Sequence, residues 1–314
     1  MDRTEKNAST NTTTWPESVT IVDVTARDGL QDADRIVSTE QKLQLVNDLI
    51  AAGVRHIEVT SFVHPGWVPQ MADADQLVTR LPRHKDVTYS VLVPNMRGYE
   101  RAKAAGSAEI ALVVSASESH NKANLNRSIA ETLAQLSAVA ACAQADGIAV
   151  RGAISTAFGC PFEGQVAREA VQSIVHAYVA MGVQQIALAD TIGVGNPHQV
   201  FELFTYIQSE VPATTSLIGH FHDRRGYGLA NVFAALQTGV SRFDVALGGL
   251  GGCPYAPGAP GNLATEVVVE FLAEMGLKTN INLNGLTKAH TSLMEALSSG
   301  EPVKNSHSVR AASS

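Results

Sequence analysis

The segment Ser38–Phe62 reads STEQKLQLVNDLIAAGVRHIEVTSF and holds one complete passage from a helix into a strand. Ser38 with Gln41 three residues on is the pattern of a capping box, so a helix is predicted to begin there. Gly53 occupies the position that glycine favours just past a helix C-terminus. The apolar and β-branched run His56–Phe62 that follows predicts a buried strand. The segment therefore predicts one helix-to-strand unit.

This unit recurs along the chain. Inside the first predicted helix, one apolar stripe at helical spacing is expected to face a sheet, and it consists of Leu43, Val46, Leu49 and Ile50. The glycine junction recurs at intervals of roughly 50–75 residues, one or two such units apart. Its further copies are Ala104-Ala105-Gly106, Met181-Gly182-Val183 and Thr238-Gly239-Val240.

Eight short apolar runs alternate with longer segments of helical period. They are Val19–Val24, His56–Phe62, Val87–Val93, Glu109–Val114, Ala149–Thr156, Gln185–Ala189, Ser216–Phe221 and Phe243–Leu247. Eight such units without a break in composition predict an α/β fold, a closed (β/α)₈ TIM barrel, as a single domain over 18–297. Residues 1–17 are expected to form a polar flexible leader and 298–314 a flexible tail. A doubly wound open sheet is the alternative, but no G-x-G-x-x-G follows the first strand.

The composition narrows the class of partner. The 314 residues are 45% hydrophobic, carry a net charge of −7 and contain three cysteines. The acidic balance argues against nucleic acid and anionic membranes as partners, because both require clustered Lys and Arg. Three scattered cysteines do not make a disulfide framework, and the polar N-terminus lacks the apolar stretch of a secretory signal. We expect a cytoplasmic protein that does not cross a membrane.

Polar residues gather where the predicted strands end, which is where barrel enzymes carry catalytic groups. His220 and His222 lie two residues apart in the seventh strand, so both imidazoles face the same side. With a carboxylate from another strand end, they would form a mixed nitrogen and oxygen metal site, and Asp28 after the first strand is the natural donor. The alternative is that the histidines are ordinary hydrogen-bonded core or surface residues.

Two further residues have chemistry suited to a barrel mouth. Arg27 precedes Asp28, and because adjacent side chains point different ways, one can bind metal while the other faces substrate. A guanidinium there can polarise a carbonyl oxygen as enolate charge develops, although a surface ion pair is the alternative. Cys253 lies in a glycine-rich loop after the eighth strand, and its thiol is suited to proton transfer if a positive charge lowers its pKa. A buried inert thiol fits Cys142 better, and Cys160 is intermediate.

The motifs together resemble one known family from about Val19 to about Leu277. They read VTARDGLQ, IEVTSFVHPGWVPQMAD, GCPFEG, LADTIGVG, HFHD followed by GLAN, and GGLGGCPYAPGAPGNLATE. These strings resemble 3-hydroxy-3-methylglutaryl-CoA (HMG-CoA) lyase. The resemblance implies cleavage of HMG-CoA, an acyl-CoA substrate, to acetyl-CoA and acetoacetate, as in leucine degradation and ketone-body formation. It also implies a homodimer.

The resemblance assigns roles by matching motif. A divalent cation, Mg²⁺ or Mn²⁺, would be held by Asp28, His220, His222 and Asn262. Arg27 would stabilise the enolate, and Cys253 would be a mobile acid/base. Glu58 would partner Arg27, and Asp190 would lie beside the metal and substrate.

Several residues depart from the family pattern, namely Ala26, His64, Phe221, Arg224 and Arg225. Strand alternation predicts that Phe221 points away from the two histidines. His64 is expected near the mouth, and the two arginines could bind a substrate carboxylate or the CoA phosphates. A 3-hydroxy-3-alkylglutaryl-CoA with a longer branch is therefore an alternative substrate.

Two other functions compete with the lyase. A condensing synthase of the isopropylmalate or homocitrate type shares the R-D-G and H-x-H motifs. Such enzymes typically have Glu where Leu30 stands, lack the GGCPYA loop and carry an added regulatory domain. A catalytically silent binding barrel would have lost a metal ligand or the cysteine, and this sequence keeps both.

Overall fold

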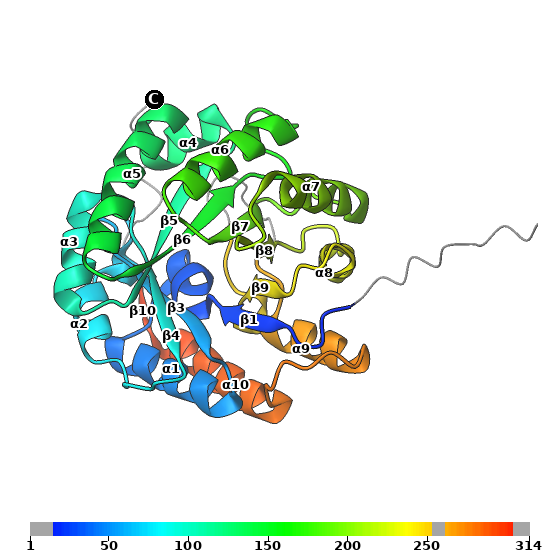
Figure 1. Ribbon diagram of the computed structural model, residues 1–314. Helices are drawn as coiled ribbons and strands as arrows, with labels where there is room; N and C mark the ends of the chain where they lie inside the picture. The colour runs from blue at the N-terminus through cyan, green and yellow to red at the C-terminus, as the bar shows by residue number, and fades with distance from the viewer. Residues whose placement is uncertain (1–14, 253–260, 304–314) are drawn as a thin grey trace, which may run out of the picture.

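The computed structural model describes residues 15–252 and 261–303 (Figure 1). Eight parallel strands close into a barrel in the order β1-β3-β4-β5-β6-β7-β8-β9. They are β1 Thr20–Asp23, β3 His56–Ser61, β4 Thr88–Leu92, β5 Glu109–Ser115, β6 Ala149–Ser155, β7 Gln185–Asp190, β8 Ser216–Phe221 and β9 Arg242–Val245. Each overlaps one of the eight predicted runs, so the predicted (β/α)₈ barrel is confirmed.

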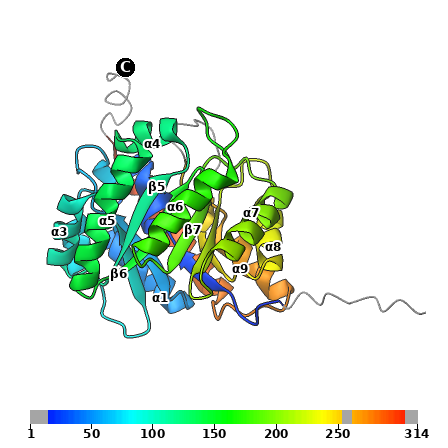
Figure 2. The same ribbon diagram turned by 45° about the horizontal axis from the view of Figure 1, so that its top comes forward.

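Helices surround the barrel on the outside (Figures 1 and 2). They are α1 Thr39–Ala52, α2 Ala74–Thr79, α3 Met96–Ala105, α4 Glu118–Leu125, α5 Ile129–Ala145, α6 Arg168–Ala180, α7 Pro197–Glu210, α8 Gly228–Gln237, α9 Thr265–Glu274 and α10 Leu283–Ser299. No helix in the described ranges is both long and apolar enough to cross a membrane.

Helix α1 begins and ends as its sequence predicts. The Ser38 side chain accepts from the Gln41 backbone N–H, and the Gln41 side chain accepts from the Ser38 N–H, which completes the capping box. Gly53 ends the helix with φ +105°, a left-handed conformation in which a Cβ would collide with the Asn280 carbonyl.

The buried face of α1 differs from the predicted stripe. Val46 and Leu49 are buried as expected, but Leu43 and Ile50 are only partly buried. Lys42 is buried instead, because its ammonium forms an ion pair with Asp73, with Nζ and Oδ1 2.7 Å apart. A hydrophobic stripe could not reveal a lysine that satisfies its charge inside the protein.

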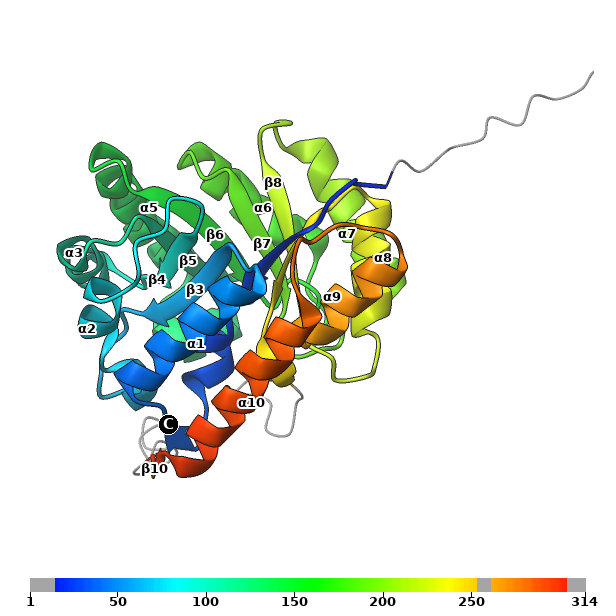
Figure 3. The ribbon, with the colours of Figure 1, turned by 90° about the horizontal axis from the view of Figure 1, so that it is seen from below.

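The C-terminal part of the described chain packs beside α1 and ends in a small two-stranded sheet outside the barrel. Figure 3 shows α10 beside α1 on the underside of the molecule. Beyond α10, the short strand β10, Glu301–Pro302, pairs antiparallel with β2, Arg35–Ile36. Glu301 and Pro302 are thus paired with the segment that precedes α1, and the expected tail from 298 stays a prediction.

Alternation along β8 divides its side chains between two environments. Phe221 is buried, with its ring 5.9 Å from that of Phe158 and 6.4 Å from that of Phe204 on α7. It therefore points outward into the helix layer, which confirms the prediction that it turns away from the histidines. His220 and His222 point inward to the barrel mouth.

Candidate active site

A π-helical turn follows β1 and brings two neighbouring side chains to the barrel mouth. In this turn, η1 Thr25–Gly29, the backbone N–H groups of Arg27, Asp28 and Gly29 all point to the Val24 carbonyl oxygen, at 3.2, 2.8 and 3.1 Å. Such turns are rare and often mark functional sites. Arg27 and Asp28 both line one cavity and form an ion pair, so they do not diverge as their adjacency suggested.

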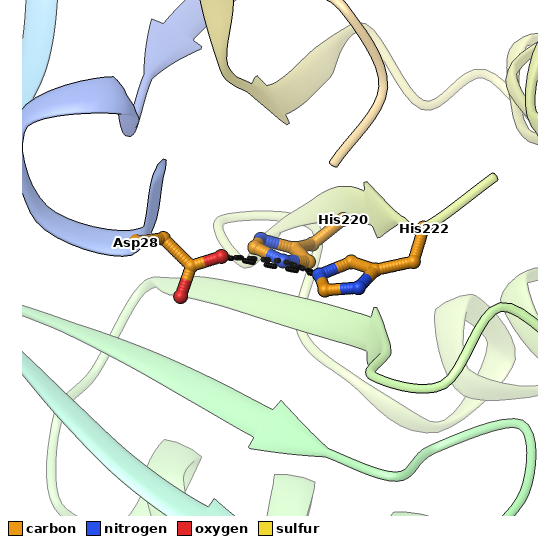
Figure 4. A group of neighbouring side chains, drawn as sticks. All are labelled: Asp28, His220 and His222. Atoms are coloured by element: carbon orange, nitrogen blue, oxygen red, sulfur yellow. Dashed lines mark hydrogen bonds and ion pairs between the residues drawn. The ribbon is translucent and has the colours of Figure 1, made fainter. Parts of the chain in front are cut away.

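The turn places Asp28 against His220 near the end of β8 and His222 just beyond it (Figure 4). Oδ2 of Asp28 lies 3.8 Å from Nε2 of His220 and 3.9 Å from Nε2 of His222, and these two nitrogens are 3.4 Å apart. Two imidazoles and a carboxylate converge, as the sequence predicted from two distant segments.

The three donor atoms lie close enough together to contact one divalent cation. By the circumradius of their triangle, the nearest point equidistant from the three atoms lies about 2.1 Å from each, within reach of the bond lengths of divalent cations to nitrogen and oxygen. Asn262 donates from Nδ2 to Oδ2 of Asp28 at 2.7 Å, and its buried Oδ1 has no hydrogen-bond partner among the described residues. An amide oxygen left unsatisfied beside the cluster suits an oxygen-binding cation.

Arg27 is held between two carboxylates. Its Nε donates to Glu58 and its Nη1 to Asp28, so the sequence-predicted partner Glu58 is in contact. Burial would lower the pKa of Arg27, but the charges of Asp28 and Glu58 outweigh it and hold the pKa above its usual range. Burial would likewise raise the pKa of Asp28, yet Arg27 and the histidines keep it well below the usual value. The turn thus carries one fixed cation and one fixed anion.

The sequence did not identify two buried residues beneath the histidines, Asp244 on β9 and Arg151 on β6. Arg151 Nη2 donates to both carboxylate oxygens of Asp244, at 2.8 and 2.6 Å. Oδ2 of Asp244 lies 3.4 Å from Nδ1 of His220. Burial favours neutral His220, but Asp244 and Asp28 outweigh it and raise the pKa of the imidazole. The sequence did carry a signal for both residues. Arg151 is the charged residue in the run Ala149–Thr156, and Asp244 is the charged residue in the run Phe243–Leu247.

Asp190 at the end of β7 holds a loop. Its carboxylate accepts from the backbone N–H groups of Val194 and Gly195, at 3.0 and 2.8 Å, and burial raises its pKa. The side chain is buried and is not among the described residues that line the cavity. A direct role at the metal or substrate stays a prediction.

The three cysteines have different outcomes. Cys253 lies outside the described residues. Cys160 is buried and its sulfur lies 2.9 Å from Ser117 Oγ. Cys142 is exposed on α5, so the expectation of a buried inert thiol was wrong for it. An alanine-rich helix buries only one of its faces, and Cys142 falls on the other.

The cluster opens into a cavity of about 1170 Å³. The cavity runs outward past His64 and the exposed Trp67, which confirms that His64 lies near the mouth. Arg97 and Arg127 line its outer part. Arg224 and Arg225, which the sequence suggested for anion binding, are not among the described lining residues; Arg224 lies against Gly193.

A closed parallel barrel with a two-histidine, one-carboxylate cluster in a deep cavity at its carboxyl end defines a class. It is the class of (β/α)₈ barrel enzymes whose strand-end loops carry the catalytic groups, here with the donor set of a divalent metal site.

Known proteins place the chain within that class. The HMGL-like family model matches residues 18–293. The hydroxymethylglutaryl-CoA lyase of Bacillus subtilis is 43% identical over 291 residues, which are 93% of this chain and 97% of that protein. The crystal structure of the HMG-CoA lyase from Brucella melitensis has a TM-score of 0.86 and 45% identity, over 90% of this chain and 100% of that one. An Acinetobacter baumannii HMG-CoA lyase, in complex with coenzyme A and 3-methylmalate, has a TM-score of 0.86 and 39% identity, over 95% of this chain and 97% of that one.

The chain belongs to the HMGL-like family, and it is an enzyme of the oxo-acid lyase type. The relatives favour the lyase over the condensing synthase and the silent barrel.

Proposed function

We propose that this enzyme cleaves HMG-CoA to acetyl-CoA and acetoacetate with Mg²⁺ or Mn²⁺ bound by Asp28, His220, His222 and Asn262. The observation that carries the proposal is the triangle of donor atoms, with edges of 3.4, 3.8 and 3.9 Å, beside a buried arginine. The family supplies the reaction, because relatives that match nearly the whole chain carry the lyase name.

The cluster lies where it can act on the substrate's tertiary hydroxyl. A divalent cation bound there would act as a Lewis acid and lower the energy of the alkoxide formed from that hydroxyl. Asp244 and Arg151 hold His220 from behind, which fixes its orientation and presents Nε2 to the cluster. Asn262 orients Asp28 through its hydrogen bond.

Arg27 would act on the thioester. When the C2–C3 bond breaks, its electron pair passes to C2 and delocalises onto the thioester oxygen as an enolate. The guanidinium lies in the same cavity as the cluster, and Glu58 and Asp28 hold it before the charge develops, so it can stabilise that enolate without reorganising. The proton that the tertiary hydroxyl loses leaves to solvent, and the enolate gains one proton at C2 to become acetyl-CoA, so the cleavage consumes no net proton. We propose Cys253 as the donor of that second proton.

Arg97 and Arg127 would serve the coenzyme. Both line the outer part of the cavity, where a thioester with its acyl end at the cluster would project its phosphates. The Acinetobacter baumannii relative is described with coenzyme A bound. Homodimerisation, cytoplasmic location and a place in leucine degradation stay predictions from the resemblance.

The direct test is to incubate the purified chain with HMG-CoA and Mg²⁺ or Mn²⁺ and to quantify products. We expect acetoacetate and acetyl-CoA in equal amounts, formation that stops on adding a chelator, and recovery when metal is returned. Absence of acetoacetate with both metals would contradict HMG-CoA as the substrate.

The role of Cys253 is tested by Cys253→Ala. We expect kcat to fall by about 10²–10⁴-fold, the usual contribution of a positioned proton donor, with little change in metal affinity. Cys142→Ala changes an exposed thiol on α5 and should leave kcat unaltered. A Cys253→Ala enzyme with full activity would rule out the acid/base assignment.

A further inference from the structure

The cavity beside the cluster has two chemically different sides. One side, the charged wall, carries Arg27, Asp28, Glu58, Arg151, His220, His222 and Asp244. The other side, the alanine wall, comes from the neighbouring strands β5, β6 and β7 and carries Ala111, Val113, Ala153, Ala187 and Ala189.

Strand register makes the alanine wall continuous. Val113 pairs with Ala153, and Ala153 pairs with Ala187, so these side chains lie next to one another across three strands. The interior of such barrels is usually filled by bulky branched residues. Four alanines therefore leave the barrel interior unfilled on this side, and the cavity extends into it.

The exposure of two side chains in the wall also indicates a recess, the unfilled part of the barrel interior beside the alanine wall. Ala153 and Val113 are only partly buried although they face the inside of a closed barrel. The neighbour of Ala153 on the opposite face of β6, Ile154, is completely buried. An inward side chain of a closed barrel can be exposed only through the cavity, so open space lies against Val113 and Ala153, whereas the other three members of the wall are buried.

The recess begins at the metal cluster. Ala189 pairs in register with His220, which makes it the strand neighbour of a proposed ligand. Along β6, the recess is bounded by Ser155 toward the mouth and by the buried Arg151 below, four residues apart or about 13 Å of strand. The side chains between these limits are hydrocarbon, so the recess suits a hydrocarbon group.

We infer that the preferred substrate carries, on the carbon bearing the hydroxyl, an alkyl chain of several carbons in place of the methyl group of HMG-CoA. This inference rests on the proposed lyase function. With the hydroxyl at the cluster and the thioester at Arg27, two substituents of that carbon remain, the carboxymethyl arm and the alkyl group. The carboxylate of the first stays with the cations of the charged wall, and the alkyl group starts beside Ala189. Its burial against Ala153 and Val113, the two partly exposed members of the wall, removes apolar surface from water, which the methyl group does to a much smaller extent. Cleavage gives acetyl-CoA and a 3-oxo acid lengthened by the same carbons.

The inference is tested by comparing kcat/KM for 3-hydroxy-3-alkylglutaryl-CoA thioesters with methyl, propyl and pentyl substituents, each with Mn²⁺. We expect kcat/KM to rise with chain length, by about tenfold or more from methyl to pentyl. A pentyl value below the methyl value would overturn the inference and leave the lyase intact. Absence of product from every thioester would instead overturn the lyase function, and the inference with it.

Ala153→Leu should fill the recess and lower the ratio of pentyl to methyl kcat/KM by about 100-fold. Ala141→Leu, an equal change at an exposed position on α5, should leave the ratio unchanged. If Ala153→Leu does not fold, Ala153→Val is the smaller substitution, and the free acid 3-hydroxy-3-pentylglutarate provides a binding measurement by calorimetry with Mn²⁺. An unaltered ratio in a folded variant, or pentyl acid binding no tighter than methyl acid, would overturn the assignment.

Discussion

The charged wall and the alanine wall face one cavity and are built from neighbouring strands, yet they differ in nearly every physical property. The charged wall is a connected network in which Arg27 touches Asp28 and Glu58, and Arg151 touches Asp244. The alanine wall consists of side chains that make only van der Waals contacts. The difference indicates that one group of side chains carries the chemistry and another selects the substrate, with β6 contributing Arg151 to the first and Ala153 to the second.

This separation has an energetic consequence. Removing one member of the charged wall leaves a buried charge without its partner, which costs about 3–5 kcal/mol and disturbs several residues together. Enlarging an alanine changes only the space beside it. Substitutions on the two walls should therefore affect different measurements, metal binding in one case and chain-length preference in the other.

His220→Ala should have the largest effect, because it removes a proposed ligand from the centre of the charged wall. We expect loss of detectable Mn²⁺ binding by electron paramagnetic resonance, with loss of lyase activity. His198→Ala, at an exposed site on α7, is the matched control. Unchanged Mn²⁺ affinity in His220→Ala would exclude the site as described.

Asp244→Asn should have a smaller effect through the same ligand. The amide keeps the shape of the carboxylate but not its charge, so His220 loses the group that orients it. We expect Mn²⁺ to bind about 10–100-fold more weakly while the substituent preference of the alanine wall is retained. Asp86→Asn, an exposed surface carboxylate, is the control. Weaker discrimination between methyl and pentyl substrates without loss of Mn²⁺ affinity would break the proposed separation.

The barrel fold and the meeting of Asp28 with the two histidines could be predicted from the sequence. Each apolar run sits in a strand because burial on both faces requires continuous hydrophobicity. His220 and His222 share a face because strand side chains alternate. Asp28 joins them because parallel strands end at the same edge of the barrel. These rules require the order and direction of the strands, but not the identity of the residues that face one another across the barrel.

The remaining features depend on partners that sequence alone does not reveal. Asp244 and Arg151 are separated by 93 residues, and only barrel closure makes a charged residue in one strand the partner of another. The alanine wall depends on register across β5, β6 and β7. The joint placement of Arg27 and Asp28 depends on a π-helical turn, which no periodic pattern in the sequence predicts.

The smallest effect concerns Asp23, a buried carboxyl on β1 outside the charged wall. Its carboxylate accepts from Thr25 N–H and Thr265 Oγ, at 3.0 and 2.8 Å, and burial is the largest influence on its pKa. Burial raises its pKa to about 6, whereas cationic partners lower the pKa of Asp28 and Asp244. Asp23 therefore shows how burial shifts the pKa of a carboxyl in this protein, against which the effect of the cationic partners of Asp28 and Asp244 can be compared.

The direction of the pH dependence follows from the number of protons that Asp23 holds in the folded and the unfolded chain. Between the ordinary aspartate pKa of 3.8 and about 6, folded Asp23 holds a proton that the unfolded chain has lost. Its contribution to the free energy of unfolding therefore falls as pH rises through this window and is lost above it. Asp23→Asn removes this dependence. Relative to the parent, the variant should gain on the order of 1 kcal/mol between about pH 5 and about pH 7, measured by urea unfolding. Asp48→Asn on the surface of α1 is the control, and a pH-independent difference for Asp23→Asn would show that Asp23 is already ionised in the folded protein.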